Sequence, residues 1–361
     1  MLWIDIATPK YALFFSKMIP ALKKIDEQIL VTTRHSNSYD EVTKILALLK
    51  LEHIVLGNYG GASVKEKFNA RLKRQSEFVD IFEEHGYPDA LICGSSVEGV
   101  QTAFGLGIPV IHFADTPIKG HRFAYEDITI LSRLTIPLSS LIFHPFVIPG
   151  DVYTKMGVAP ENVISHGFID VCLWMDDIEK KEENDFRKRY GLDTSKPTIL
   201  IREEEYKAHY VQEQLPIIYD AIRLLSKEMD ANIVIMPRYE SDYLKEQFSD
   251  LALILEEKLS PEEFYPFIDL LVGGGGTMNL EASYYGIPVI STRSLHLYHD
   301  RYLIENGLMQ WTDDTREVLR LAQEHIGKKR ENRRYFCPDK CDFSQIIDRI
   351  GLFLRSRRGK V

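Results

Sequence analysis

Short apolar runs alternate along the chain with longer segments in which apolar residues recur every three or four positions. The short runs predict buried strands and the longer segments predict amphipathic helices. In the first half, strands are predicted at residues 2–6, 28–33, 53–57, 89–93, 110–113 and 140–143. Helices are predicted at residues 39–51, 63–85 and 97–106. Strands separated by helical crossovers are typical of a parallel sheet covered on both faces, so this half predicts a Rossmann-like unit.

A charge-rich segment at residues 176–185 interrupts the pattern, and a second alternating series follows it. Strands are predicted there at residues 198–202, 232–236, 253–255, 270–272 and 289–291, and helices at residues 210–229 and 315–326. A chain of 361 residues also exceeds the usual size of a single core. We therefore expect an α/β protein with two Rossmann-like, doubly wound domains facing a cleft, at residues 1–172 and 173–341. The segment 342–361 contains a last helix, near residues 343–357, that could cross back to the first domain, which periodicity alone does not decide.

The run Gly273-Gly-Gly-Gly-Thr277 is the most informative motif, because it lies between a predicted strand and a helical stretch that ends at Gly286. Glycines let the backbone approach a ligand closely. The start of a helix also presents unpaired N–H groups and the positive end of its dipole. The run Gly274, Gly275, Gly276 and Thr277 therefore predicts a phosphate or diphosphate site.

Glu281 lies four residues after Thr277, on the same helix face and about 6 Å further along the axis. A carboxylate at that distance from a phosphate site is placed to accept hydrogen bonds from a ribose diol. The alternative is a tight turn from strand to helix with a solvated glutamate. No Gly-Lys-Ser/Thr sequence ends the run and no third glycine stands at Met278 or Asn279, so the motif is neither a P-loop nor a dinucleotide fingerprint.

Net charge, hydropathy and cysteine count exclude several further classes of function. The net charge is −9, which gives little support to nucleic-acid binding. Charged residues interrupt every long apolar run, so we expect no transmembrane segment. Only four cysteines are present and the chain opens directly on a strand-like run, so we expect a cytoplasmic protein. No ligand set for a metal ion is identifiable, and we expect neither a metal nor another cofactor.

The opening Trp3-Ile-Asp-Ile-Ala-Thr-Pro9 with Phe14-Phe15, the Asp115-Thr-Pro117 turn, the Arg202-Glu-Glu-Glu-Tyr206 stretch and residues 273–291 together resemble the DUF354 family, found largely in archaea. That family is similar to GT-B glycosyltransferases and to non-hydrolysing UDP-N-acetylglucosamine 2-epimerases. The resemblance implies a GT-B fold and a nucleotide-sugar ligand, most often UDP-linked. It does not supply a reaction.

The resemblance also implies roles for individual residues. Gly274, Gly275, Gly276 and Thr277 match the diphosphate-binding turn of GT-B proteins, and Glu281 matches the acid that holds the ribose hydroxyls. Arg202 ends the first strand of the second domain, where related epimerases place a basic residue near the phosphates. The alternative for Arg202 is a surface charge cluster with the three glutamates that follow it.

Two departures from the relatives bear on the reaction. The loop Ala7-Thr-Pro-Lys10 lacks the glycine-rich form of the muramyl-lipid glycosyltransferases. His112-Phe-Ala-Asp115 resembles the epimerase segment His-Val-Glu-Ala-Gly only in part, because the glutamate and the glycine are missing. Epimerisation therefore stays open without being favoured.

Sugar transfer needs a stabilised leaving group and, in an inverting reaction, a base that takes a proton from the acceptor. Asp115 and His112 are the candidate bases, since both follow or end a strand of the first domain. The alternatives are an Asp115 that caps the Thr116-Pro117 turn and a His112 that makes a hydrogen bond in the core.

We predict a GT-B-type glycosyltransferase that moves a sugar from a nucleotide, preferably UDP, to an unknown acceptor. The second hypothesis is a non-hydrolysing UDP-N-acetylglucosamine 2-epimerase, and the third is a catalytically silent nucleotide-sugar-binding protein. The sequence does not reveal the sugar, the acceptor, the stereochemical course or the oligomeric state.

Overall fold

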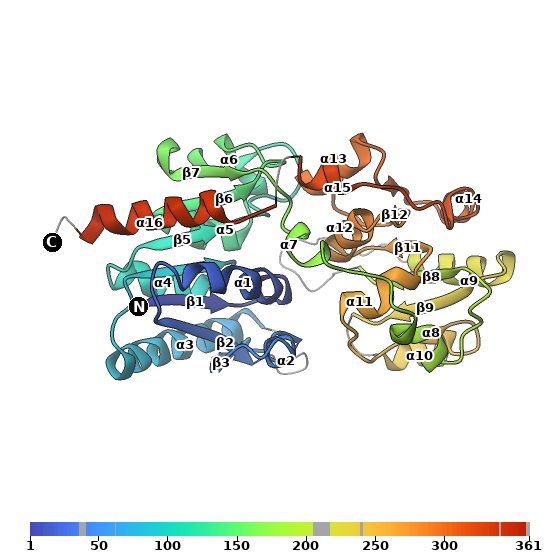
Figure 1. The fold of residues 1–361 in the computed structure, drawn as a ribbon, viewed down its shortest axis with the longest axis horizontal. Coiled ribbons are helices and arrows are strands. Elements are labelled where there is room, and N and C mark those ends of the chain that lie inside the picture. Colours follow the sequence, from blue (N-terminus) through green and yellow to red (C-terminus); the bar gives the residue numbers. More distant parts are fainter. Residues whose placement is uncertain (36–40, 62, 205–216, 239–240, 339–340, 359–361) are drawn as a thin grey trace. The chain divides into compact units, whose positions relative to one another are not determined.

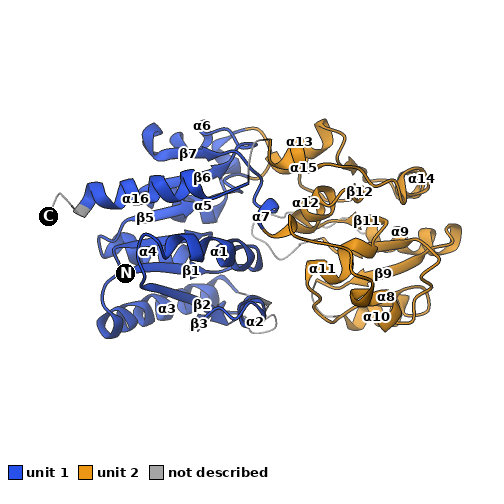
Figure 2. Ribbon diagram, viewed as in Figure 1, with its two compact units in different colours: residues 1–118, 123–173, 340–361 blue, residues 119–122, 174–339 orange. Residues whose placement is uncertain are grey.

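The computed structural model describes residues 1–361 apart from 36–40, 62, 205–216, 239–240, 339–340 and 359–361. The chain divides into two compact units (Figure 2). Unit 1 contains residues 1–118, 123–173 and 340–361, and unit 2 contains residues 119–122 and 174–339. For comparison, the sequence analysis drew its main boundary between residues 172 and 173.

Unit 1 is built on a seven-stranded sheet in the order β3-β2-β1-β4-β5-β6-β7, and every pairing between these strands is parallel (Figure 1). The strands are β1 (Leu2–Ile6), β2 (Ile29–His35), β3 (Ile54–Asn58), β4 (Ala90–Gly94), β5 (Val110–Phe113), β6 (Leu141–Pro145) and β7 (Val163–His166). Strand order reverses between β1 and β4. In open α/β sheets ligands bind beyond the carboxyl ends of the strands at such a reversal.

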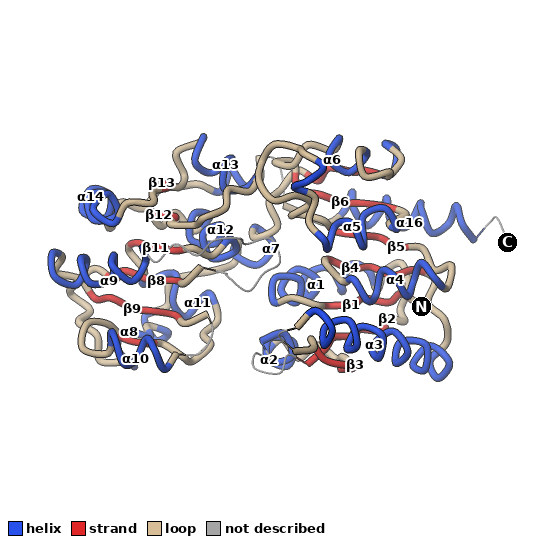
Figure 3. The backbone as a smooth tube through the Cα atoms, turned by 180° about the vertical axis from the view of Figure 1, so that it is seen from behind, coloured by secondary structure: helices blue, strands red, loops and turns tan. Residues whose placement is uncertain are grey.

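Helices cover both faces of this sheet, as the buried, Ile- and Leu-rich strands require. The helices α1 (Pro9–Leu22) and α2 (Glu41–Leu48) pack together, while α3 (Val64–His85), α4 (Val97–Gly105) and α5 (Ile130–Thr135) form the layer seen in front in Figure 3. Shorter helices are α6 (Asp151–Thr154) and α7 (Cys172–Met175). The final helix, α16 (Ser344–Arg358), also belongs to unit 1, where the Phe343 ring just before it contacts the rings of Phe14 and Phe168.

The core of unit 1 contains a buried ion pair as well as apolar side chains. Trp3 packs edge-on against Phe78 and Phe82 of α3. Beside them, Arg74 donates through Nη1 and Nη2 to the two carboxylate oxygens of Asp5, at 3.1 and 2.6 Å, and both side chains are fully buried. This pair ties α3 to the central strand β1.

Unit 2 repeats the design with a six-stranded parallel sheet in the order β10-β9-β8-β11-β12-β13. Its strands are β8 (Thr198–Arg202), β9 (Asn232–Met236), β10 (Leu253–Ile254), β11 (Leu270–Gly273), β12 (Val289–Ser291) and β13 (Gln310–Trp311). Its helices are α8 (Phe186–Arg189), α9 (Ile217–Glu228), α10 (Asp242–Phe248), α11 (Pro261–Phe264), α12 (Gly276–Tyr284), α13 (Tyr298–Glu305), α14 (Thr315–His325) and α15 (Arg333–Phe336). The reversal of strand order falls between β8 and β11.

The fold class expected from the sequence is confirmed, since both units are doubly wound, parallel-sheet α/β domains. All eleven predicted strands are present, each within two residues at either end. Among the elements that the pattern missed are α1, shorter helices such as α5 and α10, and the edge strands β7 and β13. The seven buried residues of the fourteen in α1 recur at helical spacing, but apolar residues also lie between them and Pro20 stands inside the helix, so the period was not recognised. The starts of the predicted helices at 39–51 and 210–229 lie outside the described residues.

Two short helical-turn segments complete the connections near the functional residues. The turn Tyr265–Phe267 precedes β11, and Tyr125–Asp127 lies in the long connection after β5.

Within the described part of the chain, no helix is long and apolar enough to cross a membrane.

Candidate functional site

The glycine run of unit 2 lies at the carboxyl edge of the sheet, at the reversal of strand order. Gly273 ends β11 and pairs in register with Arg202, which ends β8. The N–H of Gly274 then donates to the Arg202 carbonyl at 3.1 Å. We call Arg202 and residues 274–277 the glycine cradle. The structure thus brings together the arginine, the glycines and Thr277 that the sequence singled out.

Helix α12 starts inside the cradle without a side-chain cap. Its N-cap is Gly275, and no side chain accepts a hydrogen bond from the first turn. Gly276 and Thr277 are the first two helical residues, and both are partly accessible. The N–H groups of this first turn have no partner within the helix, so they are placed to bind an anion.

Close packing explains why the run needs glycine. A Cβ on Gly274 would lie 2.5 Å from the Glu204 Cβ and 2.7 Å from the Glu204 Cα, distances that side-chain rotation cannot relieve. The backbones after β8 and β11 therefore run too close together for any side chain at position 274.

Two further arginines, Arg238 and Arg293, lie beside the cradle with its own Arg202. A Cβ on Gly275 would lie 3.4 Å from the Arg202 Cγ and 3.7 Å from the Arg238 Nη1, and one on Gly276 would lie 3.2 Å from the Arg293 Nη1. The Arg293 guanidinium is fixed by Asp300 at 2.8 Å. Positive charge therefore converges on the helix start that already attracts anions.

Polar atoms around the cradle are left without hydrogen-bond partners in the described part of the chain. Arg202 donates through Nη1 to the carbonyls of Met236 and Pro237, at 3.2 and 2.7 Å, but its buried Nε has no acceptor there. The buried Glu204 Oε2 and Asn279 Oδ1 likewise have no donor among those residues. Buried polar atoms are normally paired, so these three mark a place where a ligand or water is expected.

Glu281 lies one turn along α12 and is almost fully buried. Its Oε1 accepts from the Trp174 indole at 2.7 Å, and its Oε2 accepts from the Tyr265 hydroxyl at 2.6 Å. Burial and the adjacent Glu281 charge raise the pKa of Tyr265 well above its usual value, so the phenol stays protonated and donates. These two hydrogen bonds hold the Glu281 carboxylate in one orientation.

Unit 1 gathers a second cluster at the carboxyl edge of its own sheet, which we call the lysine cluster: Lys10, Asp115, Asp170 and His166. The Lys10 ammonium, in the first turn of α1, lies 2.5 Å from a carboxylate oxygen of Asp115 and 2.5 Å from one of Asp170. Burial works to lower the pKa of Lys10, but the two carboxylates outweigh it and raise the pKa above its usual value. Lys10 therefore remains charged, and Asp115 is the more accessible of the two acids, with 20% of its side chain exposed against 5% for Asp170.

His112, the other candidate base, is built into the core of unit 1. Its Nδ1 lies 3.1 Å from the Ser139 Oγ, whose own proton is donated to the Thr135 carbonyl, so Nδ1 is the ring donor. Its Nε2 accepts from the Ser95 N–H at 3.4 Å. Burial lowers the pKa of His112 to about 4, so the ring is neutral at pH 7. Both ring nitrogens are thus engaged, an arrangement that suits a structural histidine; its catalytic role stays a prediction.

His166 completes the lysine cluster from the end of β7. Its Nε2 lies 3.5 Å from an Asp170 oxygen, without the alignment of a hydrogen bond, and its ring packs on Phe168 at 4.3 Å. Burial lowers the pKa of His166 to about 4, which outweighs the opposing effect of Asp170. The His166 ring is therefore a neutral group packed between Phe168 and Asp170.

Sequence reasoning missed several of these residues. Arg238 and Arg293 follow β9 and β12 by two residues each, so the rule that places ligands beyond strand ends could have found them. The long-range partners Trp174 and Tyr265 carried no comparable signal. Lys10 belongs to residues 7–10, which the sequence analysis treated as a loop and which include the first turn of α1, whereas Asp170 follows the strand β7 that the pattern missed.

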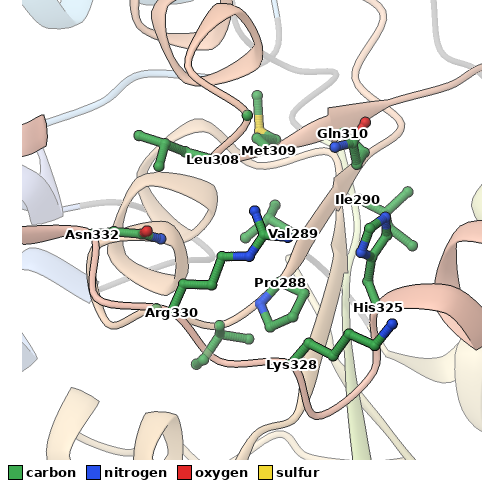
Figure 4. A pocket seen from close by; sticks show the side chains of 13 residues that line it. Pro288, Val289, Ile290, Leu308, Met309, Gln310, His325, Lys328, Arg330 and Asn332 are labelled. Atoms are coloured by element: carbon green, nitrogen blue, oxygen red, sulfur yellow. The ribbon is translucent and has the colours of Figure 1, made fainter.

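A separate concavity lies at the opposite edge of the unit 2 sheet, before β12 and β13 (Figure 4). It is lined by residues 286–290 and 307–310 with the side chains of His325, Lys328, Arg330 and Asn332. These residues stand at the amino ends of the strands, away from the cradle. The concavity is therefore not the predicted nucleotide site.

Comparisons with known proteins agree with this architecture. The model of DUF354, a family described as protein of unknown function, matches residues 1–353. An uncharacterised protein of Methanocaldococcus jannaschii is 27% identical over 332 residues, covering 91% of this chain and 92% of that protein.

Two solved structures share the fold over nearly their whole length. MnaA of S. aureus, in a structure with UDP, superimposes with a TM-score of 0.75 at 15% identity, over 98% of this chain and 96% of that one. The UDP-GlcNAc 2-epimerase of Methanocaldococcus jannaschii, in complex with UDP-GlcNAc and UDP, gives a TM-score of 0.73 at 17% identity, over 98% of this chain and 99% of that one. At such identities the likeness concerns the fold, and it confirms the expected GT-B architecture.

Proposed function

The chain belongs to the DUF354 family, and from its fold and its glycine cradle we propose that it is a GT-B-type glycosyltransferase that takes a sugar from a UDP-linked donor. The two structural neighbours described above were solved with UDP or UDP-GlcNAc, which supports a ligand of the same class here. The sugar and the acceptor stay open.

One observation carries the proposal. The buried Arg202 Nε has no acceptor among the described residues, and the Cγ of the same side chain lies beside Gly275, the N-cap of α12. A diphosphate supplies the missing acceptor and also satisfies the N–H groups of that turn. Structural arginines in a protein interior normally have all their buried donors paired, so a purely structural role for Arg202 leaves this atom unexplained.

The same geometry suits the chemistry of transfer. When the bond between the sugar and the phosphate breaks, negative charge grows on the departing UDP. The α12 N–H groups and the nearby guanidinium groups stabilise that charge without having to reorganise. Glu281, held by Trp174 and Tyr265, is oriented to accept hydrogen bonds from the ribose hydroxyls.

For the proton that an acceptor hydroxyl must lose, we propose Asp115 as the base. The Lys10 ammonium lies 2.5 Å from this carboxylate and holds it in one orientation. Asp115 is also the exposed acid of the lysine cluster, whereas Asp170 is buried. Lys10 acts here through Asp115, as a positioning residue.

Epimerisation at C2 is the second candidate, favoured by the reaction named for one of the structural neighbours. It shares the need to bind UDP and to loosen the sugar–phosphate bond. It differs in that a proton leaves C2 of the sugar and returns to the other face, with no acceptor required.

The two reactions separate in heavy water. The protein is incubated with UDP-GlcNAc in D2O and the products are followed by NMR. An epimerase forms the manno epimer with deuterium at C2, whereas a transferase leaves C2–H intact and releases UDP quickly only when a suitable acceptor is added. Absence of UDP binding by calorimetry would overturn both candidates.

An Asp115→Asn variant then tests the base. It should bind UDP like the unaltered protein, because the cradle belongs to unit 2, yet lose most of its transfer rate, by roughly 10²-fold or more. Transfer at the original rate would exclude Asp115 as the base.

A further inference from the structure

An exposed apolar stripe runs along the first half of α3 in unit 1. Val64, Phe68 and Leu72 are spaced four residues apart, so they lie on one helix face, and they are 83%, 48% and 50% exposed. Further along the helix, the side chains of Phe78 and Phe82 are fully buried in the core. The stripe is therefore surplus to the packing of α3 on its sheet. Soluble proteins rarely leave apolar side chains contiguous on the surface unless they bind something.

Basic side chains flank the stripe. Lys65, Lys67, Arg71 and Lys73 all lie between residues 64 and 74, and the Arg71 guanidinium lies 5.6 Å from the centre of the Phe68 ring. Lys67 also extends over the ring of Tyr59, which follows β3 and is 37% exposed, at 5.2 Å.

The acidic side chains on this part of the helix already have partners within the protein. Glu66 accepts hydrogen bonds from the backbone N–H and the hydroxyl of Ser63 in a capping box. Glu77 lies 3.8 Å from Lys73. A locally basic surface therefore stands on a chain whose net charge is −9.

We propose that this face of α3 docks on an anionic lipid membrane surface. Apolar and aromatic side chains that enter the headgroup region, flanked by Lys and Arg that meet lipid phosphates, are the features by which helices bind in the plane of a membrane. Each Lys or Arg near such a surface strengthens binding about fivefold. The association is peripheral, and it stands independently of the proposed nucleotide site in unit 2.

Charge argues against a second copy of the chain as the occupant. Two copies related by a twofold axis would bring the same patch onto itself. The basic flanks of the two stripes would then face each other without enough acids to compensate them. An anionic surface meets the same flanks with opposite charge.

The test is co-sedimentation of the full chain with vesicles. Vesicles of phosphatidylglycerol and phosphatidylcholine should bind the protein at least tenfold more tightly than vesicles of phosphatidylcholine alone, and added salt should release it. Phe68→Glu should abolish this binding. Phe104→Glu is the matched control, because Phe104 is 58% exposed on α4, a helix without Lys or Arg, and it should bind as the original protein does.

Equal binding to both kinds of vesicle, or equal loss in the Phe68→Glu and Phe104→Glu proteins, would overturn the proposal. A concentration-dependent dimer that disappears in Phe68→Glu would overturn it in favour of a second copy. Calorimetry with UDP on the same proteins keeps the result separate from the proposed function, since neither substitution lies in unit 2. Unaltered circular dichroism and melting temperature in Phe68→Glu show that a loss of binding is not a loss of fold.

Discussion

Exchange of Gly275 for alanine tests the glycine cradle. The new methyl group fits into the unliganded protein, but it would occupy space that a bound diphosphate needs. Gly275 has φ −98° and ψ 130°, an extended conformation that alanine adopts readily. The added Cβ would make ordinary van der Waals contacts with Arg202, at 3.4 Å, and Arg238, at 3.7 Å. Alanine is a poorer N-cap than glycine, so we expect a cost of about 1 kcal/mol in the free energy of unfolding. The melting temperature should fall by roughly 2–4 °C or less.

In this variant the affinity for UDP should fall far more than the stability of the fold. The methyl group points to the side where the arginines approach, so it displaces a phosphate held by the first-turn N–H groups. Loss of one charge-assisted hydrogen bond costs about 1.5–3 kcal/mol. The dissociation constant for UDP should therefore rise roughly 10- to 100-fold.

Isothermal titration calorimetry with UDP measures this difference. Gly105→Ala is the control, because a Cβ at that position would meet no atom within 4 Å. It should bind UDP with unchanged affinity. If Gly275→Ala kept its fold and also bound UDP normally, the diphosphate would not occupy the cradle and the reasoning from α12 would fail.

Three further outcomes can be measured. Arg74→Met removes both guanidinium donors from the buried Asp5 carboxylate. The free energy of unfolding should therefore fall by about 3–5 kcal/mol, measured by thermal unfolding. A melting temperature near that of the original protein would contradict the burial argument. Burial lowers the pKa of His112 and His166 from 6.5 to about 4, so the unfolded chain binds more protons between these values and the free energy of unfolding should fall as pH drops from 6.5 towards 4, by about 3 kcal/mol per histidine. Denaturant titrations at pH 6.5 and pH 4 should show a smaller change in the free energy of unfolding for His112→Gln than for the original protein. An equal change would refute the lowered pKa of His112. Glu281→Ala should weaken UDP binding in calorimetry, and normal affinity would remove Glu281 from the ribose role.

The hydrophobic pattern predicted the two sheets well because buried parallel strands are short, apolar and separated by helices. The resemblance to related epimerases implied that Arg202 lies near the phosphates, and the structure brings it beside the glycines, since Arg202 and Gly273 end neighbouring strands. The pattern did not predict α1, because apolar residues also fill positions between the buried ones and Pro20 stands inside the helix. It also gave no sign that Trp174 and Tyr265 would hold Glu281, because such contacts depend on how distant segments pack.

The contacts of the lysine cluster could be predicted from the sequence only in part. Lys10 and Asp115 both follow predicted strands, so their meeting at one edge of the sheet could have been anticipated. The pairing of Lys10 with Asp170 depends on β7, a four-residue strand with only one buried residue. Short edge strands with little burial carry too weak a pattern to be recognised, and with them go the residues that they position.

The placement of α16 has a consequence for biosynthesis. Unit 1 is completed by residues 340–361, which a ribosome makes only after the whole of unit 2. Domains near the start of a chain usually fold while the rest is still being translated. Here the rings of Phe14 and Phe168 can meet Phe343 only after unit 2 has been translated. The nascent first unit would therefore keep these two aromatic rings without their partner while unit 2 is being translated.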